Sequence, residues 1–174
     1  MAELTEIRWH ARAGQGAKTA AQLLALASLR DGRSVQAFPE YGPERRGAPL
    51  RAYTRLSDRP IRRHDAITEP DVVVVIEPSL VHEADVAEGL AEDGVVLLNA
   101  ESPPPDLKGV EVRCIPATRL AAGQENVVML GAVARRLGMP PLLELQDAAV
   151  ELLGRKAGAD AVRAAIAEGY RWTG

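Results

Sequence analysis

The run DVVVVI at residues 71–76 constrains the fold more than any other segment, because Asp71 is its only polar residue. β-Branched residues favour extended backbone. A strand that is apolar on both faces fits the middle of a parallel sheet whose two faces are covered. Such sheets are built by alternating strands with helices. The segment therefore predicts an α/β fold.

Strand and helix patterns alternate along the rest of the chain. Residues 50–56 alternate apolar and polar side chains with a period of two, which is typical of a strand with one solvated face and makes this segment the candidate for an antiparallel strand. We predict one domain, residues 1–174, with a doubly wound, mostly parallel sheet flanked by helices and a helical C-terminal region. The other predicted strands are 4–10, 34–38, 71–76, 95–99 and 110–115, and the predicted helices are 17–32, 80–92, 117–137, 142–154 and 159–170.

The residue inventory argues against several kinds of site. With one cysteine, Cys114, the chain can form no internal disulfide and cannot supply the four thiolates that an iron–sulfur cluster normally needs. The three histidines lie far apart and lack the spacing of metal ligands. A net charge of −3 argues against a general nucleic-acid binder, and no apolar stretch has the length of a signal peptide or membrane span. These features predict a soluble cytoplasmic protein without a metal site.

The turn ARAGQG, residues 11–16, lies between the first predicted strand and the first predicted helix. A dinucleotide-binding fingerprint needs Gly or Ala where Thr19 stands, and a phosphate-binding loop needs Gly where Ala17 stands. Both fingerprints are therefore broken. The amides of a helix N-terminus, with Arg12 and Lys18 nearby, can still bind a phosphate. The other interpretation is a tight turn in which glycine only permits close packing.

The segment PEYGPERRGAP, residues 39–49, is the most singular one. Three prolines and two glycines in eleven residues exclude regular secondary structure and favour one loop shape at low entropic cost. Tyr and Arg are enriched at the hot spots of protein interfaces, and two adjacent arginines can also bind a phosphate or carboxylate. We predict an interaction surface here, with a solvated charged loop as the alternative. The interface candidates are Glu40, Tyr41, Glu44, Arg45 and Arg46.

Both unusual loops follow predicted strands, so we expect them at the same edge of the sheet, where doubly wound folds bind their ligands. His10 ends the first strand beside the glycine turn and is a candidate either for a ligand contact or for a core or interface position. Asn126 opens a predicted helix and is interpreted as a helix cap or a ligand contact. Cys114 closes an apolar strand and is interpreted as a structural thiol.

Three segments together resemble a known family: IRWHARAGQGAKTAAQLLA at 7–25, VQAFPEYGPERRGAPLRAYTRLSDRPI at 35–61 and EPDVVVVIEPSL at 69–80. The chain resembles the gamma subunit of the 2-oxoacid:ferredoxin oxidoreductases of the pyruvate or 2-oxoisovalerate type. Residues 125–138 and 165–170 fit the same family, so the resemblance covers essentially the whole length. The PEYGPERRG run is long and distinctive, whereas the Gly-Gln-Gly turn alone is a weak signal.

The resemblance implies a function for the complex and a place for this chain in it. The family converts a 2-oxoacid, coenzyme A and oxidised ferredoxin into acyl-CoA, carbon dioxide and reduced ferredoxin. The resemblance implies that thiamine diphosphate, Mg and iron–sulfur clusters belong to alpha, beta and delta partner subunits. The gamma chain is then expected to bear no cofactor and to pack against its partners on the coenzyme A side of the active site. The residues expected near coenzyme A or its phosphates are Arg12, Gly14, Gln15, Gly16, Lys18 and Asn126.

The family's turn reads nearer to GRGGQG, so Ala11 and Ala13 stand here in place of two glycines. An alanine costs free energy wherever the backbone needs a positive φ. Apart from the family function, the residues are compatible with a stand-alone nucleotide- or phosphate-binding module and with a purely structural assembly subunit. When the chain is expressed alone, the apolar surface meant for its partners favours self-association, for example as a homodimer.

Overall fold

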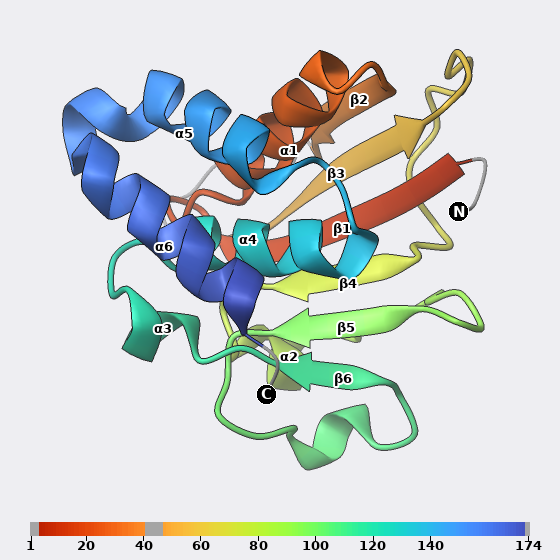
Figure 1. The fold of residues 1–174 in the computed structure, drawn as a ribbon. Coiled ribbons are helices and arrows are strands. Elements are labelled where there is room, and N and C mark those ends of the chain that lie inside the picture. Colours follow the sequence, from red (N-terminus) through yellow and green to blue (C-terminus); the bar gives the residue numbers. More distant parts are fainter. Residues whose placement is uncertain (1–3, 41–46, 173–174) are drawn as a thin grey trace.

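The computed structural model describes residues 4–40 and 47–172, and its centre is one six-stranded sheet (Figure 1). The strands are β1 (Leu4–Arg12), β2 (Ser34–Pro39), β3 (Pro49–Ser57), β4 (Val72–Val75), β5 (Val95–Leu98) and β6 (Val112–Cys114). Their order across the sheet is β2-β3-β1-β4-β5-β6. β3 runs antiparallel to both β1 and β2, while β1, β4, β5 and β6 pair in parallel. The predicted mostly parallel sheet and the antiparallel strand within it are both confirmed.

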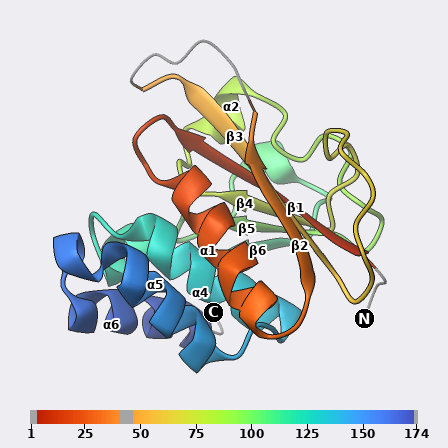
Figure 2. The ribbon, with the colours of Figure 1, turned by 90° about the horizontal axis from the view of Figure 1, so that it is seen from above.

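Long helices cover one face of this sheet. The helical elements are α1 (Ala17–Arg30), α2 (Leu80–Glu83), the 3₁₀ turn η1 (Pro105–Leu107), α3 (Ala117–Leu120), α4 (Glu125–Leu137), α5 (Leu142–Ala157) and α6 (Ala159–Arg171). Helices α1, α4, α5 and α6 gather on one side of the strands, and the short helix α2 lies on the other (Figure 2). The alternating side chains of β4 divide accordingly, because Val72 and Val74 pack under the long helices while Val73 and Val75 face α2 and η1.

The prediction of a helix over 80–92 is wrong beyond its first turn, since α2 ends at Glu83. The reason lies in a buried arginine. Arg8 donates from its guanidinium to the carbonyl oxygens of Val86, at 3.1 Å, and Glu88, at 2.5 Å. These carbonyls are thereby bound to a side chain of β1 rather than to helical amides four residues on. Tertiary contact overrides local helix propensity here.

The face of the sheet opposite the long helices carries buried charged side chains at β1 and β3. Arg55 is fully buried and donates from Nε to Glu6 at 2.6 Å. Arg8 is 4% exposed, His10 is 3% exposed, and Arg8 Nε donates to His10 Nε2 at 3.1 Å. His10 is thus a core residue on this face, which decides between its two predicted roles. Burial first, and then the positive charges of Arg8 and Arg51, lower the pKa of His10 from its ordinary 6.5 to about 3.

Helices α4 and α6 approach each other so closely that glycine is required at the crossing. A Cβ atom added to Gly169 of α6 would lie 1.8 Å from the carbonyl oxygen of Val128 in α4. A Cβ atom on Gly131 of α4 would lie 2.1 Å from the carbonyl oxygen of Ile166 in α6. The backbones of the two helices therefore touch without intervening side chains, and this contact fixes their packing on the sheet.

Candidate functional site

The turn between β1 and α1 takes its shape from two glycines. Gly14 has a φ of 101° and Gly16 a φ of 82°, values that favour glycine. Throughout the described residues, positive φ values occur only at glycines, so neither Ala11 nor Ala13 needs one. Replacing the two family glycines by alanine therefore imposes no backbone strain on this turn. Ala11 lies in β1, next to its last residue, and is buried.

Gln15 connects this turn to the end of β4 through both ends of its side chain. Its Oε1 accepts from the backbone N–H of Arg12 at 2.6 Å, and its Nε2 donates to Glu77 Oε2 at 2.6 Å. The backbone N–H of Gln15 also donates to the Arg12 carbonyl oxygen at 3.0 Å. The Gln15 side chain therefore links the turn to Glu77 and fixes the position of the turn over the sheet edge. We call this pair of side-chain hydrogen bonds, to Arg12 and Glu77, the Gln15 strut.

Glu77 is held in its charged form at this position. Burial opposes ionisation, but hydrogen bonds from Gln15 and Ser79, together with the charge of Arg12, outweigh it and lower the pKa of the Glu77 carboxyl group. The backbone N–H of Ser79 donates to Glu77 Oε1 at 3.2 Å. Each oxygen of the carboxylate thus has a donor of this chain, and the group carries a negative charge at neutral pH.

A cavity of about 750 Å³ lies beside this turn, at the carboxyl ends of β1, β4 and β5. This is the edge where doubly wound sheets bind ligands. Its walls come from the glycine turn, the β4 and β5 ends, the N-terminal parts of α3 and α4, and the C-terminal part of α5. The residues that line it are Gly14, Gln15, Gly16, Thr19, Ile76, Glu77, Pro78, Asn99, Thr118, Gly123, Gln124, Glu125, Asn126, Val127, Leu153, Lys156 and Ala157.

Asn126 ties the start of α4 to the glycine turn. Its Nδ2 donates to the Gly16 carbonyl oxygen at 3.4 Å, and a Cβ atom on Gly16 would lie only 2.5 Å from that nitrogen. Its interpretation as a helix cap is wrong, because the side chain bonds to a distant turn and the residue before α4 is Gln124. The start of α1 and the start of α4 are thereby brought to one cavity, each with backbone N–H groups that lack intrahelical partners.

The buried Asn99 organises the adjoining wall. It follows β5, donates to the Ile76 carbonyl oxygen at 2.9 Å and to Thr118 Oγ1 at 3.1 Å, and accepts from the Thr118 N–H at 3.2 Å. Sequence reasoning missed both Asn99 and Glu77. The signal was present, since each is a polar residue directly after an apolar strand whose carboxyl end faces the site.

Of the six residues predicted near the coenzyme, four line the cavity: Gly14, Gln15, Gly16 and Asn126. The other two do not. Arg12 is occupied elsewhere, by an ion pair with Glu83 and by hydrogen bonds from its guanidinium to Ser79 Oγ at 3.0 Å and the Gly47 carbonyl at 3.3 Å. Lys18 is exposed on α1 outside the cavity.

The predicted interface loop meets the glycine turn, which confirms that both lie at one edge of the sheet. The Ala13 N–H donates to the Ala48 carbonyl oxygen at 2.9 Å, and the Gly47 N–H donates to the Ala13 carbonyl oxygen at 3.4 Å. Glu40 accepts from the Tyr53 hydroxyl group at 2.8 Å. The remaining interface candidates, Tyr41, Glu44, Arg45 and Arg46, lie outside the described residues.

Among the described residues, the ionisable groups that line the cavity are Glu77, Glu125 and Lys156, whose formal charges sum to −1. Both helix starts already have a carboxylate nearby. Glu77 is bonded to Gln15 beside α1, and Glu125 lies in the first turn of α4, where its Oε1 accepts from the Gly123 N–H at 3.1 Å. These carboxylates offset the attraction of the helix starts for an anion. Polar uncharged parts of a ligand fit the lining better than a bare phosphate.

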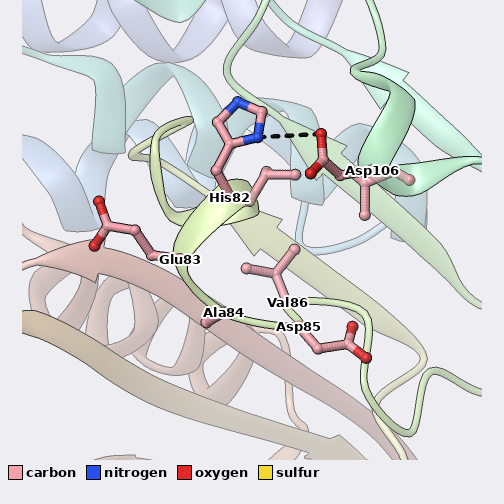
Figure 3. Close-up of a pocket in the computed structure, with 8 residues that line it drawn as sticks. His82, Glu83, Ala84, Asp85, Val86 and Asp106 are labelled. Carbon is pink, nitrogen blue, oxygen red and sulfur yellow. Dashed lines mark ion pairs between the residues drawn. The ribbon is translucent and has the colours of Figure 1, made fainter.

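A second, more open hollow of about 440 Å³ lies under α2 on the other face of the sheet. Figure 3 shows His82 and Asp106 pointing toward one another across it, with Nδ1 and Oδ2 3.1 Å apart. Glu83 and Asp85 also line it. The side chains of His82 and Asp106 are 64% and 40% exposed, so their interaction is solvated and weak. We therefore regard the larger cavity as the candidate site.

Within the described ranges, no group of three or more His, Cys, Asp and Glu side chains has an arrangement that could hold a metal ion. None of the helices in that part of the chain is long and apolar enough to cross a membrane. Cys114 is half-buried, and its burial raises the pKa of the thiol, in agreement with a structural role.

Comparison with known proteins gives consistent matches over nearly the whole chain. Residues 6–172 match the family model described as pyruvate ferredoxin/flavodoxin oxidoreductase. The pyruvate synthase subunit PorC of Thermotoga maritima is 43% identical over 95% of this chain and 92% of its own length. The pyruvate/ketoisovalerate oxidoreductases common subunit gamma of Thermococcus kodakarensis is 42% identical over 93% of this chain and 94% of its own.

A solved structure agrees with the sequence matches. The crystal structure of the pyruvate oxidoreductase subunit PORC from Thermotoga maritima superposes with a TM-score of 0.83 at 38% sequence identity. The superposition covers 97% of this chain and 96% of that one. The six-stranded sheet and its flanking helices are thus the same architecture from end to end.

Proposed function

This chain belongs to the pyruvate ferredoxin/flavodoxin oxidoreductase family, and we propose that it is the gamma subunit of a cytoplasmic 2-oxoacid:ferredoxin oxidoreductase. The reaction proposed for the complex converts a 2-oxoacid, coenzyme A and oxidised ferredoxin into acyl-CoA, carbon dioxide and reduced ferredoxin. The observation that carries the proposal is the mutual coverage with relatives named as gamma subunits, 93% of this chain and 94% of the relative.

In this proposal the chain contributes binding and positioning rather than redox chemistry. Thiamine diphosphate with Mg would supply the decarboxylation chemistry and iron–sulfur clusters the electron path, both in the alpha, beta and delta partner subunits. The single cysteine and the lack of a metal-binding cluster among the described residues fit this division. The part left to this chain is to shape one side of the coenzyme A site and to hold the partners together.

The test is isolation of the assembled enzyme through a tag on this chain. The eluate should contain larger partner subunits, thiamine diphosphate and the visible absorbance of iron–sulfur clusters, and it should reduce ferredoxin when given a 2-oxoacid and coenzyme A. A colourless, partner-free chain that binds nucleotides by itself would contradict the proposal. That result would favour a stand-alone nucleotide-binding module.

We propose that the large cavity contacts coenzyme A through the glycine turn and the start of α4. The contacts that support this are the Gln15 strut and the bond from Asn126 to Gly16, because both fix the turn at the cavity wall. Since the lining carries one net negative charge, we assign it to the amide-bearing part of the coenzyme. The phosphates then need cationic groups elsewhere.

Replacing Gln15 or Asn126 with alanine should raise the KM for coenzyme A about tenfold while kcat changes little. One lost hydrogen bond in the positioning of the turn corresponds to about 1.4 kcal/mol, or a factor of ten. The measurement is steady-state ferredoxin reduction by the assembled enzyme at varied coenzyme A. His82→Ala, in the separate hollow, is the control and should leave the KM unchanged. An equal rise of the KM in all three variants would show that the cavity is not part of the coenzyme site.

We further propose that the 39–48 segment is the subunit interface. The double substitution Arg45→Ala with Arg46→Ala should weaken assembly of the complex at least tenfold, because arginine side chains commonly dominate interface energies. Size-exclusion chromatography of diluted complex measures it. The matched control is Arg62→Ala with Arg155→Ala, which removes two exposed arginines from other surfaces. An intact complex with the Arg45 and Arg46 substitutions would assign the interface to a different surface.

A further inference from the structure

A small cavity of about 150 Å³ opens at the β6 edge of the sheet, away from the candidate coenzyme site. Its apolar part consists of Leu97, Ile115 and Ala132, each at least 93% buried. Among the described residues, three arginines and no acidic residue line the rest: Arg113 from β6, and Arg135 and Arg136 from the last turn of α4. A cationic cavity stands out in a chain whose net charge is −3.

Trp172 closes one side of this cavity in a fixed position. Its indole Nε1 donates to the Cys114 carbonyl oxygen at 2.8 Å. The guanidinium carbon of Arg119 lies 5.7 Å from the centre of its ring, within the range of a cation–π contact. The tryptophan is thus held both by the edge strand and by α3, so the cavity does not require a rearrangement to form.

The arginines of this cavity are only lightly committed to partners within the protein. In residues 4–40 and 47–172, no ion pair or side-chain hydrogen bond engages the guanidinium groups of Arg135 and Arg136. Arg135 stacks at 5.8 Å on the Tyr170 ring. Arg113 pairs with Glu111 at 3.1 Å, but both side chains are at least half exposed, so this pair is readily exchanged for another anion.

Favourable interaction with a helix C-terminus explains arginines in the last turn of α4. It does not explain Arg113, which reaches the same cavity from a strand. Cations from two elements that converge over an apolar floor provide the two things that a carboxylate with a short hydrocarbon tail requires. The guanidinium groups bind the carboxylate, and the floor removes the tail from water. The volume is small beside the ~300–1,000 Å³ of cavities for larger ligands.

We propose that this cavity, which we call the Arg136 pocket (Leu97, Arg113, Cys114, Ile115, Ala132, Arg135, Arg136 and Trp172), binds a small aliphatic carboxylate. The carboxylate lies against Arg113 and Arg136, and its tail lies on Ile115 and Ala132 beside the Trp172 ring. The site is separate from the coenzyme cavity, and its occupancy requires no partner subunit. All eight residues that line it belong to this chain.

The probe series is acetate, butyrate and octanoate, with inorganic phosphate as the anion without a tail. Binding is read from the intrinsic fluorescence of the purified full chain, which has two tryptophans, Trp172 at the pocket and the fully buried Trp9. We expect saturable quenching, with butyrate about tenfold tighter than acetate because two more methylene groups are buried. Octanoate should bind no better than butyrate, since the pocket cannot hold its longer tail.

The Arg113→Gln and Arg136→Gln variants should each lose butyrate affinity about tenfold, as expected for a charge-assisted hydrogen bond. Arg155→Gln is the matched control, because this exposed arginine also lies in the last turn of a helix, and it should keep full affinity. Trp172→Phe should abolish the quenching, while calorimetry still detects binding.

Three results would overturn the proposal: no saturable binding of butyrate, equal affinity for phosphate and butyrate, or an equal loss in the Arg155 control. The first would show that the arginines only stabilise the helix end, the second that the apolar floor takes no part, and the third that the response is general to positive charge. Each of these outcomes is independent of subunit assembly and leaves the proposed gamma-subunit role unaffected.

Discussion

Replacing Gly169 with alanine should destabilise the protein by about 3 kcal/mol or more, a large fraction of the usual total stability of ~5–15 kcal/mol. The added methyl group would overlap the Val128 carbonyl oxygen, 1.8 Å away, and that oxygen belongs to helix backbone. Relief requires α6 to move away from α4, which breaks the packing around Val162, Ala165 and Ile166. The usual gain of about 1 kcal/mol for alanine over glycine in a helix is too small to offset this.

The control is the same substitution at Gly154, in the interior of α5. There a Cβ atom would approach a flexible side chain, Val150 Cγ1 at 3.2 Å, and no backbone closer than 3.8 Å. Gly154→Ala should therefore be neutral or slightly stabilising. Urea unfolding of both variants gives the comparison. Equal midpoints for Gly169→Ala and Gly154→Ala would mean that the α4–α6 crossing has room for a methyl group.

Lowering the pH from 7 to 4 should cost the protein stability through His10, and a His10→Gln variant should lose less over the same range. The pKa of His10 is about 3 in the folded state and 6.5 in the unfolded chain, so the unfolded state binds the proton first. The neutral imidazole thus contributes full stability above pH 6.5, and this contribution is lost as the pH falls toward 3. The complete loss is on the order of 5 kcal/mol.

Glutamine is the informative replacement because its side-chain oxygen can accept from Arg8 in place of Nε2 but does not titrate. The free energy of unfolding, measured by urea at a series of pH values, should fall less steeply for His10→Gln than for the unmodified protein. His64→Gln, at an exposed position, is the matched control. Parallel curves for all three proteins would show that folding does not lower the pKa of His10.

Local patterns were sufficient to predict the sheet. The valine run of β4 is apolar on both faces because helices pack on one side and α2 with η1 on the other. The alternation of 50–56 marked the antiparallel β3. The extent of α2 could not be predicted in this way, because the carbonyls of Val86 and Glu88, in the segment that would continue the helix, are bound by Arg8, more than seventy residues earlier in the chain. A long-range hydrogen bond leaves no trace in a local pattern.

In the site, too, local patterns predicted some residues and long-range contacts determined others. Gly14, Gln15 and Gly16 were identifiable because the turn follows a strand and precedes a helix. Arg12 and Lys18 were expected there on charge alone, and charge does not determine direction: Arg12 turns to Glu83, and Lys18 to solvent. Likewise, nothing local in the glycines of α4 and α6 indicates that they face each other.

The paired hydrogen bonds between Ala13 and residues 47–48 have a thermodynamic consequence. Ala13 is part of the turn that walls the cavity, and residues 47–48 end the segment proposed to contact a partner. A partner that displaces residues 47–48 must displace Ala13 as well. Subunit binding and ligand binding in the cavity therefore share the free energy of moving this turn. Linkage of this kind is reciprocal. Whatever factor assembly applies to the affinity for a ligand in the cavity, that ligand applies to the affinity between the subunits.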